Sequence, residues 1–252
     1  MDAEMGQLET QGTYELGDLL EGQKAVGCRW VFTIKRDNDG RVIKHKARLV
    51  AQGFSQIPGQ DFFVTYAPVV CLESFRACTT IATAQDLDDD MINYEGAYLN
   101  GMLTETIYMR QAPGYNNGTG CICIMRKAIY GLKQASRVWN DLLNHVLTNL
   151  LGFMCSQADT CVYYKPADKL TMALLHINDT TLYGERKHLD DLKLEILHSF
   201  AITSSGGLQN FVSLQIDHDR LAHTLKLHQS CYIHTILEHF GMADCNAVLT
   251  PL

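Results

Sequence analysis

The chain has 252 residues, of which 46% are hydrophobic and 19% charged, so it is long enough for one large domain with a real core and has an ordinary globular composition. Its formal net charge of −7 argues against a protein that coats nucleic acid with its whole surface. No apolar run approaches the roughly 18 residues of a membrane span. The acidic start MDAEMGQLETQ lacks the basic and apolar parts of a secretory signal, so we expect no membrane partner.

The predicted elements mix strands and helices along the whole chain. Residues 3–21 have the pattern of a short helix followed by a strand, and β-rich runs at 28–36 and 41–50 flank the turn DNDG. Farther on, periodicity predicts helices at 72–87, 138–150, 189–200 and 233–240, and β-rich or alternating runs predict strands near 88–93 and at 121–131, 161–165, 171–177, 211–217 and 223–228. This order indicates an α+β protein with helices packed on one face of mixed strands.

The nine cysteines are scattered, odd in number and mostly within apolar runs. This pattern predicts reduced, buried thiols in an intracellular protein. Cys121 and Cys123 form a C-x-C pair that could bind a metal ion. No second close pair and no nearby histidine accompany them, so a strand explains the spacing better.

The segment 24–48 is basic although the chain as a whole is acidic. It holds eight lysines and arginines against two aspartates, a surplus of six positive charges that leaves −13 for the remainder. A basic lobe on an acidic body suits a local contact with phosphate groups. The alternative is a solvated, charged hairpin, which is the commoner reason for a charge run.

The run ALLHINDTTLYG at 173–184 carries the most informative polar residues. Two strand-like stretches flank a tight Asn-Asp turn, which predicts that Asn178 and Asp179 lie at a hairpin tip. A second polar element, INYEGAYLNG at 92–101, could bring Asn93 beside them. Together they have the skeleton of a two-metal phosphoryl-transfer site, but most of the negative charge that such a site needs is missing.

Several blocks in a fixed order carry a family resemblance over nearly the whole chain. They are GCRWVFTIKRDNDGRVIKHKARLVAQGFSQIPGQDF at 27–62, YAPVV at 66–70, AYLNG at 97–101, IYMRQAPGY at 107–115, IYGLKQASRVWN at 129–140 and LEHFGMADCNAVLTPL at 237–252. With these blocks the sequence resembles the reverse transcriptase of copia-type LTR retrotransposons. The resemblance implies RNA-directed DNA synthesis from dNTPs with Mg²⁺ on an RNA or DNA template-primer, within a longer polyprotein.

The resemblance also implies the fold and its subdivision. The expected architecture is the fingers and palm of a right-hand polymerase, the palm having a ferredoxin-like antiparallel sheet packed on helices. Residues 1–252 are then one reverse transcriptase fragment. About 1–90 is mainly fingers with the start of the palm, and about 91–252 is mainly palm, with a fingers return segment near 105–140. Ribonuclease H, integrase and protease domains are expected to be absent, as is the rest of the polyprotein.

Of the three metal-binding aspartates that the resemblance implies, one is present. Asn93 stands where the family has the first, and residues 176–179, His-Ile-Asn-Asp, stand where it has Tyr-Val-Asp-Asp. Asp179 is therefore the expected metal ligand and catalytic residue, with Asn93 and Asn178 as degenerate partners. Glu95 could replace Asn93 only if the strand continued that far, and the onset of a helix there argues against it.

The resemblance assigns substrate-binding roles to five further residues. Lys35, Lys46 and Arg48 match basic positions of a fingers hairpin that faces the incoming triphosphate. Gln134 resembles the glutamine of the nucleotide pocket, and Tyr98 matches the aromatic residue that discriminates against a ribose 2′-hydroxyl. The structural alternatives are surface charges, a polar group at a helix start and a core aromatic ring.

The departures from the family favour a damaged catalytic centre. Two Asp-to-Asn replacements remove two negative charges beside divalent cations, and at an effective dielectric near 20 each lost attraction at about 2–4 Å is several kcal/mol before solvent compensates. Residues 212–215, Val-Ser-Leu-Gln, also replace a Leu-Gly-Ile-Glu segment that guides the primer end in the family. Three hypotheses remain: a polymerase with an unusual centre, a non-catalytic nucleic-acid binder, and an inert remnant. The favoured interpretation is a degenerate reverse transcriptase copy.

Overall fold

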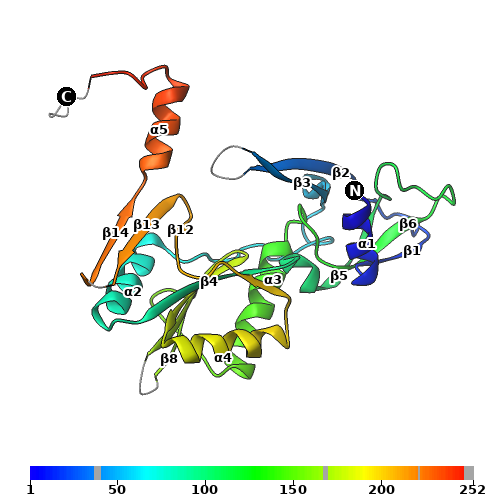
Figure 1. Cartoon of the computed structure of the whole chain (residues 1–252). Helices are drawn as coiled ribbons and strands as arrows, with labels where there is room; N and C mark the ends of the chain where they lie inside the picture. The colour runs from blue at the N-terminus through cyan, green and yellow to red at the C-terminus, as the bar shows by residue number, and fades with distance from the viewer. Residues whose placement is uncertain (37–40, 167–169, 221, 247–252) are drawn as a thin grey trace. The chain divides into compact units, whose positions relative to one another are not determined.

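A computed structural model describes residues 1–36, 41–166, 170–220 and 222–246, without the side chains of Lys35 and Arg36 (Figure 1). The chain divides into two compact units. The first unit comprises Met1–Val69, Tyr94–Phe153 and His198–Ala201, and the second comprises Val70–Asn93, Met154–Leu197 and Ile202–Leu252. Within the described residues, no helix combines the length and apolar character that a membrane span requires.

The first unit contains a small antiparallel sheet, a long hairpin and two α-helices. Its elements are α1 (Asp2–Thr10), β1 (Tyr14–Gly17), β2 (Cys28–Arg36), β3 (Val42–Ala51), β5 (Met102–Met109), β6 (Ile122–Lys127) and α3 (Ala135–His145), with 3-10 turns at Gly53–Ser55 and Ala97–Asn100. The sheet order is β1-β6-β5, and β2 pairs with β3 alone. Apolar residues of α1, β3, β5 and β6 form one buried core.

Helix α3 shows how the apolar spacing works in this unit. Trp139 and Leu143 are buried at an interval of four residues, and Leu147 continues the stripe in a π-helical turn, Val146–Leu150. Residues spaced by four lie on one helix face, so this stripe enters the core while the polar face stays outside. The predicted helix at 138–150 is therefore confirmed, but its last turn is π-helical rather than α-helical.

The second unit is built on a six-stranded antiparallel sheet with the order β11-β4-β10-β9-β8-β7. Its strands are β4 (Asp88–Tyr94), β7 (Met154–Cys155), β8 (Val162–Lys165), β9 (Thr171–His176), β10 (Asp179–Gly184) and β11 (Ile202–Ser204). Helix α4 (Arg186–Leu197) buries Leu189, Leu192 and Ile196, and it lies along one face of this sheet in Figure 1. Helix α2 (Leu72–Ala84) contacts the opposite face, where Thr79 and Tyr183 share a hydrogen bond of 2.7 Å.

A separate three-stranded sheet completes the second unit. It has the order β12-β13-β14, formed by Asn210–Phe211, Leu214–Asp219 and Thr224–His228, and it leads into helix α5 (Ser230–His239). In the larger sheet, strands β4, β9, β10 and β11 follow the chain order β4-α3-β9-β10-α4-β11 and the spatial order β11-β4-β10-β9. This arrangement is the split βαβ pattern of ferredoxin-like sheets. The expected α+β class, with an antiparallel sheet packed against helices, is confirmed. The expectation that the helices pack on one face is wrong for the large sheet, because α4 and α2 contact opposite faces.

Several element predictions differ from the structure in detail. Strand β5 was not predicted, because only its last three residues are consistently buried and its first half alternates between exposed and half-buried side chains. Helix α2 ends at Ala84 rather than at 87, since Asp86 adopts a left-handed φ of 51° that begins the turn into β4. The DNDG turn and most of the turn at 166–168 lie outside the described residues.

The expectation of buried thiols is correct for some cysteines and wrong for others. Cys78, Cys123 and Cys161 are buried, and burial raises the pKa of the Cys123 and Cys161 thiols to about 12. Cys71, Cys231 and Cys245 are exposed, because Cys71 precedes helix α2, Cys231 lies on the surface of helix α5 and Cys245 lies in the segment after α5, none of them in a strand. All nine are free thiols, as predicted.

Two glycines allow backbone segments of the first unit to touch. The backbone N–H of Ala51 donates to the carbonyl oxygen of Tyr130 at 2.8 Å. A Cβ atom on Gly131 would lie 2.1 Å from the Ala51 carbonyl oxygen, and one on Gly53 would lie 2.0 Å from the Gly131 carbonyl oxygen. Because the obstacles are backbone atoms, the contact between the β3 end and the 130–131 turn requires glycine at both positions.

We predict that Gly131→Ala destabilises the protein by about 3 kcal/mol or more, since it combines a left-handed φ with a backbone overlap. Gly114→Ala is the matched control. Gly131 and Gly114 have φ values of 89° and 86°, but a Cβ on Gly114 meets no atom within 4 Å. The control should therefore cost only about 1 kcal/mol. Urea unfolding of both variants measures the difference, and equal costs would contradict the proposed close contact.

Candidate active site

The candidate site is assembled by three neighbouring strands of the second unit. Strand β10 pairs with β4 on one side and β9 on the other, so Asp179 lies directly opposite Asn93 and directly opposite His176. Directly opposed residues of antiparallel strands share a sheet face and have Cβ atoms about 4.5–5.5 Å apart. The register therefore places the three side chains on one face at the end of the β9–β10 hairpin.

The predicted hairpin tip is displaced by one residue. The two-residue turn consists of Ile177 and Asn178, and Asp179 is the first residue of β10 rather than part of the tip. Ile177 adopts a left-handed φ of 59°. The predicted Asn-Asp turn would have placed a polar residue in this conformation. This shift pairs Asp179 with Asn93 and leaves Asn178 in the turn.

A short hydrogen bond joins Asn93 and Asp179. The amide nitrogen of Asn93 donates to a carboxylate oxygen of Asp179 at 2.5 Å. An ionised carboxylate only accepts hydrogen bonds, so the amide must present its nitrogen and turn its oxygen away. The Asn93 amide thus holds the partial positive charge that faces Asp179, and its oxygen is not aimed at the same point as the carboxylate.

These donors do not fit a pair of magnesium ions. Mg²⁺ favours carboxylate oxygens, and the site offers one carboxylate whose oxygen already accepts from Asn93. No group of three His, Cys, Asp or Glu side chains in the described parts of the chain is arranged to hold a metal ion. Glu95 does not supply the missing charge by alternation, because β4 ends at Tyr94.

The turn at Val212–Ser213 lies beside the candidate site. It joins β12 to β13, and Phe211, the residue before it, contacts the His176 ring edge-on with centroids 5.7 Å apart. The other side of Phe211 stacks on Phe75 of α2 at 3.8 Å. Because His176 and Asp179 share a face, the β12–β14 sheet meets the same face that carries Asn93 and Asp179.

Two of the predicted substrate residues, Arg48 and Tyr98, are joined by a chain of aromatic and polar contacts. The Arg48 guanidinium lies over the Tyr130 ring at 4.9 Å, and Tyr130 meets Tyr98 edge-on at 4.8 Å. The Tyr98 hydroxyl shares a hydrogen bond of 3.1 Å with the Ser136 hydroxyl. These contacts restrict Arg48 and Tyr98 to one arrangement, in which Arg48 is half-buried.

Gln134 and the two lysines have different environments. The Gln134 side chain is 1% exposed; it donates to the Asp61 carbonyl oxygen at 2.8 Å and accepts from Gln56 at 3.1 Å. The Gln134 amide therefore connects three segments of the first unit, those that contain Gln56, Asp61 and Gln134 itself. Lys46 is half-buried on β3, and the side chain of Lys35 lies outside the described residues.

A polar cluster that the sequence motifs did not indicate lies at the start of β4. Asp88, Asp89 and Asp90 are consecutive residues of β4, and all three contact basic side chains of α4 or of the segment that ends β13. Aspartate is depleted in strands, so three in a row within a strand is the signal that could have indicated this cluster.

Comparison with known proteins shows which family the chain is similar to. A family model described as "Reverse transcriptase (RNA-dependent DNA polymerase)" matches residues 11–252. The retrovirus-related Pol polyprotein from transposon TNT 1-94 of Nicotiana tabacum is 34% identical over 257 residues, covering 100% of this chain and 19% of that protein. The corresponding polyprotein from transposon RE1 of Arabidopsis thaliana is 35% identical over 232 residues, covering 90% of this chain and 16% of that protein.

A solved structure of a foamy viral protease-reverse transcriptase in complex with double-stranded DNA is also similar. It covers 99% of this chain and 37% of its own, with 10% sequence identity and a TM-score of 0.44. The chain thus spans less than a fifth of the length of the curated relatives quoted above.

We predict that Asn93→Asp lowers stability at pH 7 by about 1 kcal/mol, because it replaces a hydrogen bond by two facing carboxylates. One of the two should then titrate above the usual aspartate range of about 4. A raised carboxyl pKa favours the folded state at low pH, so the stability deficit should vanish below about pH 4 and develop as pH rises.

Thermal unfolding between pH 4 and 8 checks this prediction. Asn93→Ala is the control, since it removes the hydrogen bond to Asp179 without adding charge. Between about pH 5 and 8 a single aspartate stays ionised, so the Asn93→Ala deficit should not change with pH in that window. A pH-independent deficit in Asn93→Asp as well would mean that the two carboxylates do not face each other.

Proposed function

The chain belongs to the reverse transcriptase (RNA-dependent DNA polymerase) family, and from that premise we propose that this copia-type domain retains nucleic-acid binding but has lost most of its DNA synthesis. The observation that carries the proposal is the hydrogen bond between Asn93 and Asp179. The Asn93 amide occupies the position where the family resemblance implies a second carboxylate. The chain spans a small share of the length of its relatives. We therefore also propose, rather than observe, that the domain belongs to a longer polyprotein, binds a template-primer and uses dNTPs as substrates.

Loss of synthesis follows from the charge of the site. Enzymes of this family use divalent metal ions, and Mg²⁺ is the ion that the resemblance implies. With Asn93 and Asn178 in place of aspartates, Asp179 is the one charged ligand of the expected three. Each 1.36 kcal/mol of lost transition-state stabilisation is about a tenfold loss in rate. Two missing charges at several kcal/mol each therefore reduce the rate by many decades.

Retained binding rests on the basic hairpin of the first unit. Lys44, Lys46 and Arg48 alternate along β3, so they lie on one face of the β2–β3 ribbon. Cations at this spacing suit consecutive phosphate groups, and neutralising phosphates releases counterions. This basic face does not depend on the Asn93–Asp179 site, so binding and synthesis are separable properties.

We predict that the unaltered chain extends a DNA primer on an RNA template at or near background with Mg²⁺ or Mn²⁺. The double variant Asn93→Asp/Asn178→Asp should raise extension at least about a thousandfold, because it restores two metal-facing charges. A control double variant, Asn116→Asp/Asn117→Asp, changes the net charge equally on an exposed loop and should have no effect. Rapid extension by the unaltered chain, abolished by Asp179→Ala, would instead show a working centre.

We also predict salt-dependent binding to an RNA–DNA primer-template. Lys46→Glu and Arg48→Glu should each weaken binding and reduce the slope of log K against log salt by about one, since each removes one phosphate contact. Lys187→Glu, an exposed lysine of α4, is the matched charge reversal and should change neither. Fluorescence anisotropy from low to physiological salt measures these slopes. No binding at low salt by a folded chain would leave the inert remnant as the remaining hypothesis.

A further inference from the structure

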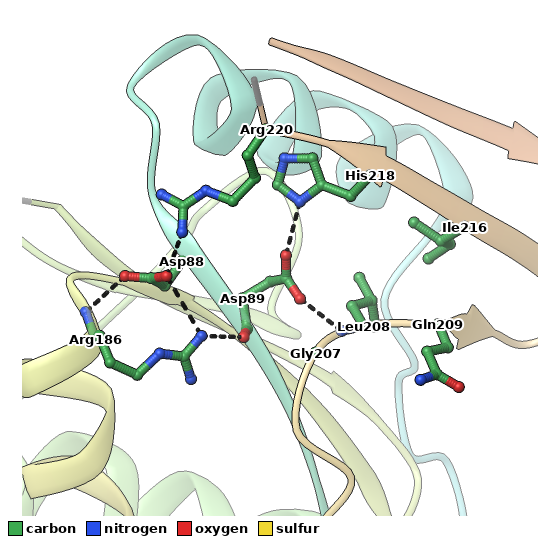
Figure 2. Close-up of a pocket in the computed structure, with 9 residues that line it drawn as sticks. All are labelled: Asp88, Asp89, Arg186, Gly207, Leu208, Gln209, Ile216, His218 and Arg220. Atoms are coloured by element: carbon green, nitrogen blue, oxygen red, sulfur yellow. Dashed lines mark hydrogen bonds and ion pairs between the residues drawn. The ribbon is translucent and has the colours of Figure 1, made fainter. Parts of the chain in front are cut away.

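The β12–β14 sheet is attached to the large sheet of the second unit at two separated points. One is apolar: Phe211, at the β12 end, stacks on Phe75 and contacts His176 beside the candidate site. The other is polar and lies where β13 ends, at His218 and Arg220 (Figure 2). Between them Ile216 of β13 is buried. Strand β13 is therefore anchored near both of its ends.

Asp89 makes the central contact of the polar anchor. One of its carboxylate oxygens accepts from Nδ1 of His218 at 3.0 Å, and the other accepts from the backbone N–H of Leu208 at 2.5 Å. Its side chain is 12% exposed, and that of His218 is 15% exposed. The carboxylate thus joins β4 to strand β13 and to the segment just before β12, in surroundings largely screened from solvent.

Arg220 forms the outer part of the same anchor. Its guanidinium donates to carboxylate oxygens of Asp88 at 2.5 Å and of Asp86 at 2.9 Å, and to the Asp86 carbonyl oxygen at 3.0 Å. Three contacts from one planar group fix its orientation as well as its distance. The guanidinium accordingly holds the end of β13 against the first residue of β4 and the turn before it.

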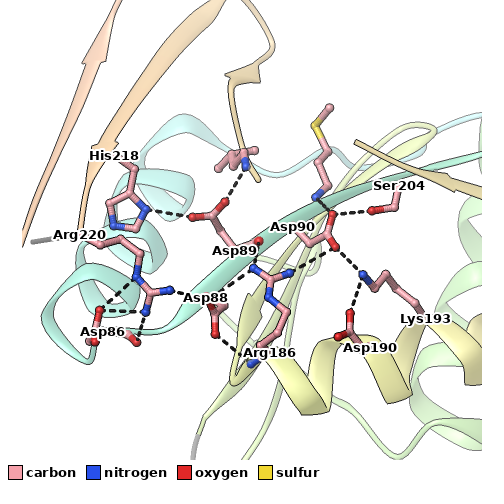
Figure 3. A network of polar contacts seen from close by, with 12 residues as sticks. Asp86, Asp88, Asp89, Asp90, Arg186, Asp190, Lys193, Ser204, His218 and Arg220 are labelled. Carbon is pink, nitrogen blue, oxygen red and sulfur yellow. Dashed lines mark hydrogen bonds and ion pairs between the residues drawn. The ribbon is translucent and has the colours of Figure 1, made fainter. Parts of the chain in front are cut away.

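The other partners of the acidic run belong to α4 and β11. Arg186 donates its backbone N–H to Asp88 at 2.9 Å, and Lys193 donates to Asp90 at 2.7 Å (Figure 3). Asp90, 1% exposed, also accepts from the Ser204 hydroxyl at 2.8 Å. The carboxylates at 88, 89 and 90 are therefore all matched by cations or donors of this chain.

A cavity of about 330 Å³ lies among these groups, lined by Asp88, Asp89, Arg186, His218, Arg220 and the 207–209 segment. Both arginine groups around it are already engaged by aspartates, as Figure 2 shows. A ligand anion would have to displace an aspartate that is hydrogen-bonded elsewhere. The cluster is better explained as a connection between elements than as a ligand site.

We propose that Asp88 and Asp89 are positioning residues that hold the β12–β14 sheet over the sheet face carrying Asn93 and Asp179. Asp89 lies four residues before Asn93 in the same strand, so both side chains project from one face. With Phe211 fixed at the opposite end, the polar anchor determines where the Val212–Ser213 turn stands relative to Asp179. The significance of that turn for a bound primer rests on the proposed function, whereas the anchor itself does not.

Hydrogen–deuterium exchange of the whole chain tests the anchor. Asp89→Asn and Arg220→Gln should speed exchange of the 210–228 amides by about tenfold, while the β9–β10 amides remain unchanged. Asp88→Asn combined with Arg220→Gln should add little to Arg220→Gln alone within 210–228, because Arg220→Gln has already removed the one contact between Asp88 and that segment. Arg220→Lys should recover part of the protection, since it keeps the charge but not the planar fork.

Glu15→Gln is the matched control, because it removes one partner of the exposed Arg126–Glu15 ion pair of the first unit. It should leave exchange at 210–228 unaltered. Unchanged protection of that segment in Asp89→Asn and Arg220→Gln would overturn the proposal. So would a uniform increase over the whole chain, since that indicates general unfolding. Faster local exchange without altered primer-template binding would support the anchor and count against the nucleic-acid role.

Discussion

The register between β4 and β10 is the constraint on which the second unit depends. It pairs Asn93 with Asp179 and Ile92 with Thr180, and Ile92 and Thr180 are fully buried. A slip of one residue would bring Asn93 to the buried face and expose Ile92, so the register is fixed by burial rather than by the polar site. The candidate site therefore keeps its geometry whether or not its side chains can bind ions.

This independence explains how the site can lose charge without losing structure. Two facing carboxylates repel one another unless cations are bound, which is an electrostatic cost that an active centre accepts. With an amide at 93, the Asp179 carboxylate has a hydrogen-bond donor within the protein. Compared with an aspartate at 93, the amide avoids a repulsion and adds a contact, so it favours the folded state and attracts divalent ions less.

The sequence predicted what local patterns determine. The apolar spacing over 138–150 specified α3, and the β-rich runs around 37–40 specified the β2–β3 hairpin, because period and turn chemistry act over short distances. Pairing of Asn93 with Asp179 came from a family resemblance, not from spacing. Contacts such as Asp89 with His218 join residues 129 positions apart, and no local pattern encodes them. The hairpin tip was misplaced because Ile177 takes a conformation that its side chain disfavours.

Positions 89 and 93, on the same face of β4, illustrate two kinds of electrostatic balance. The Asp89 carboxylate accepts hydrogen bonds from His218 and from a backbone N–H of this chain, so it stabilises the fold without a bound ion. A carboxylate at 93 would be balanced by ions that dissociate, so it would contribute to catalysis but oppose folding between catalytic cycles. Replacement of an aspartate at 93 would therefore be opposed by function alone, whereas replacement of Asp89 is opposed by stability. A chain no longer selected for DNA synthesis would lose the carboxylates that bind metal ions. It would keep the carboxylates that pair with cations or hydrogen-bond donors of the chain itself.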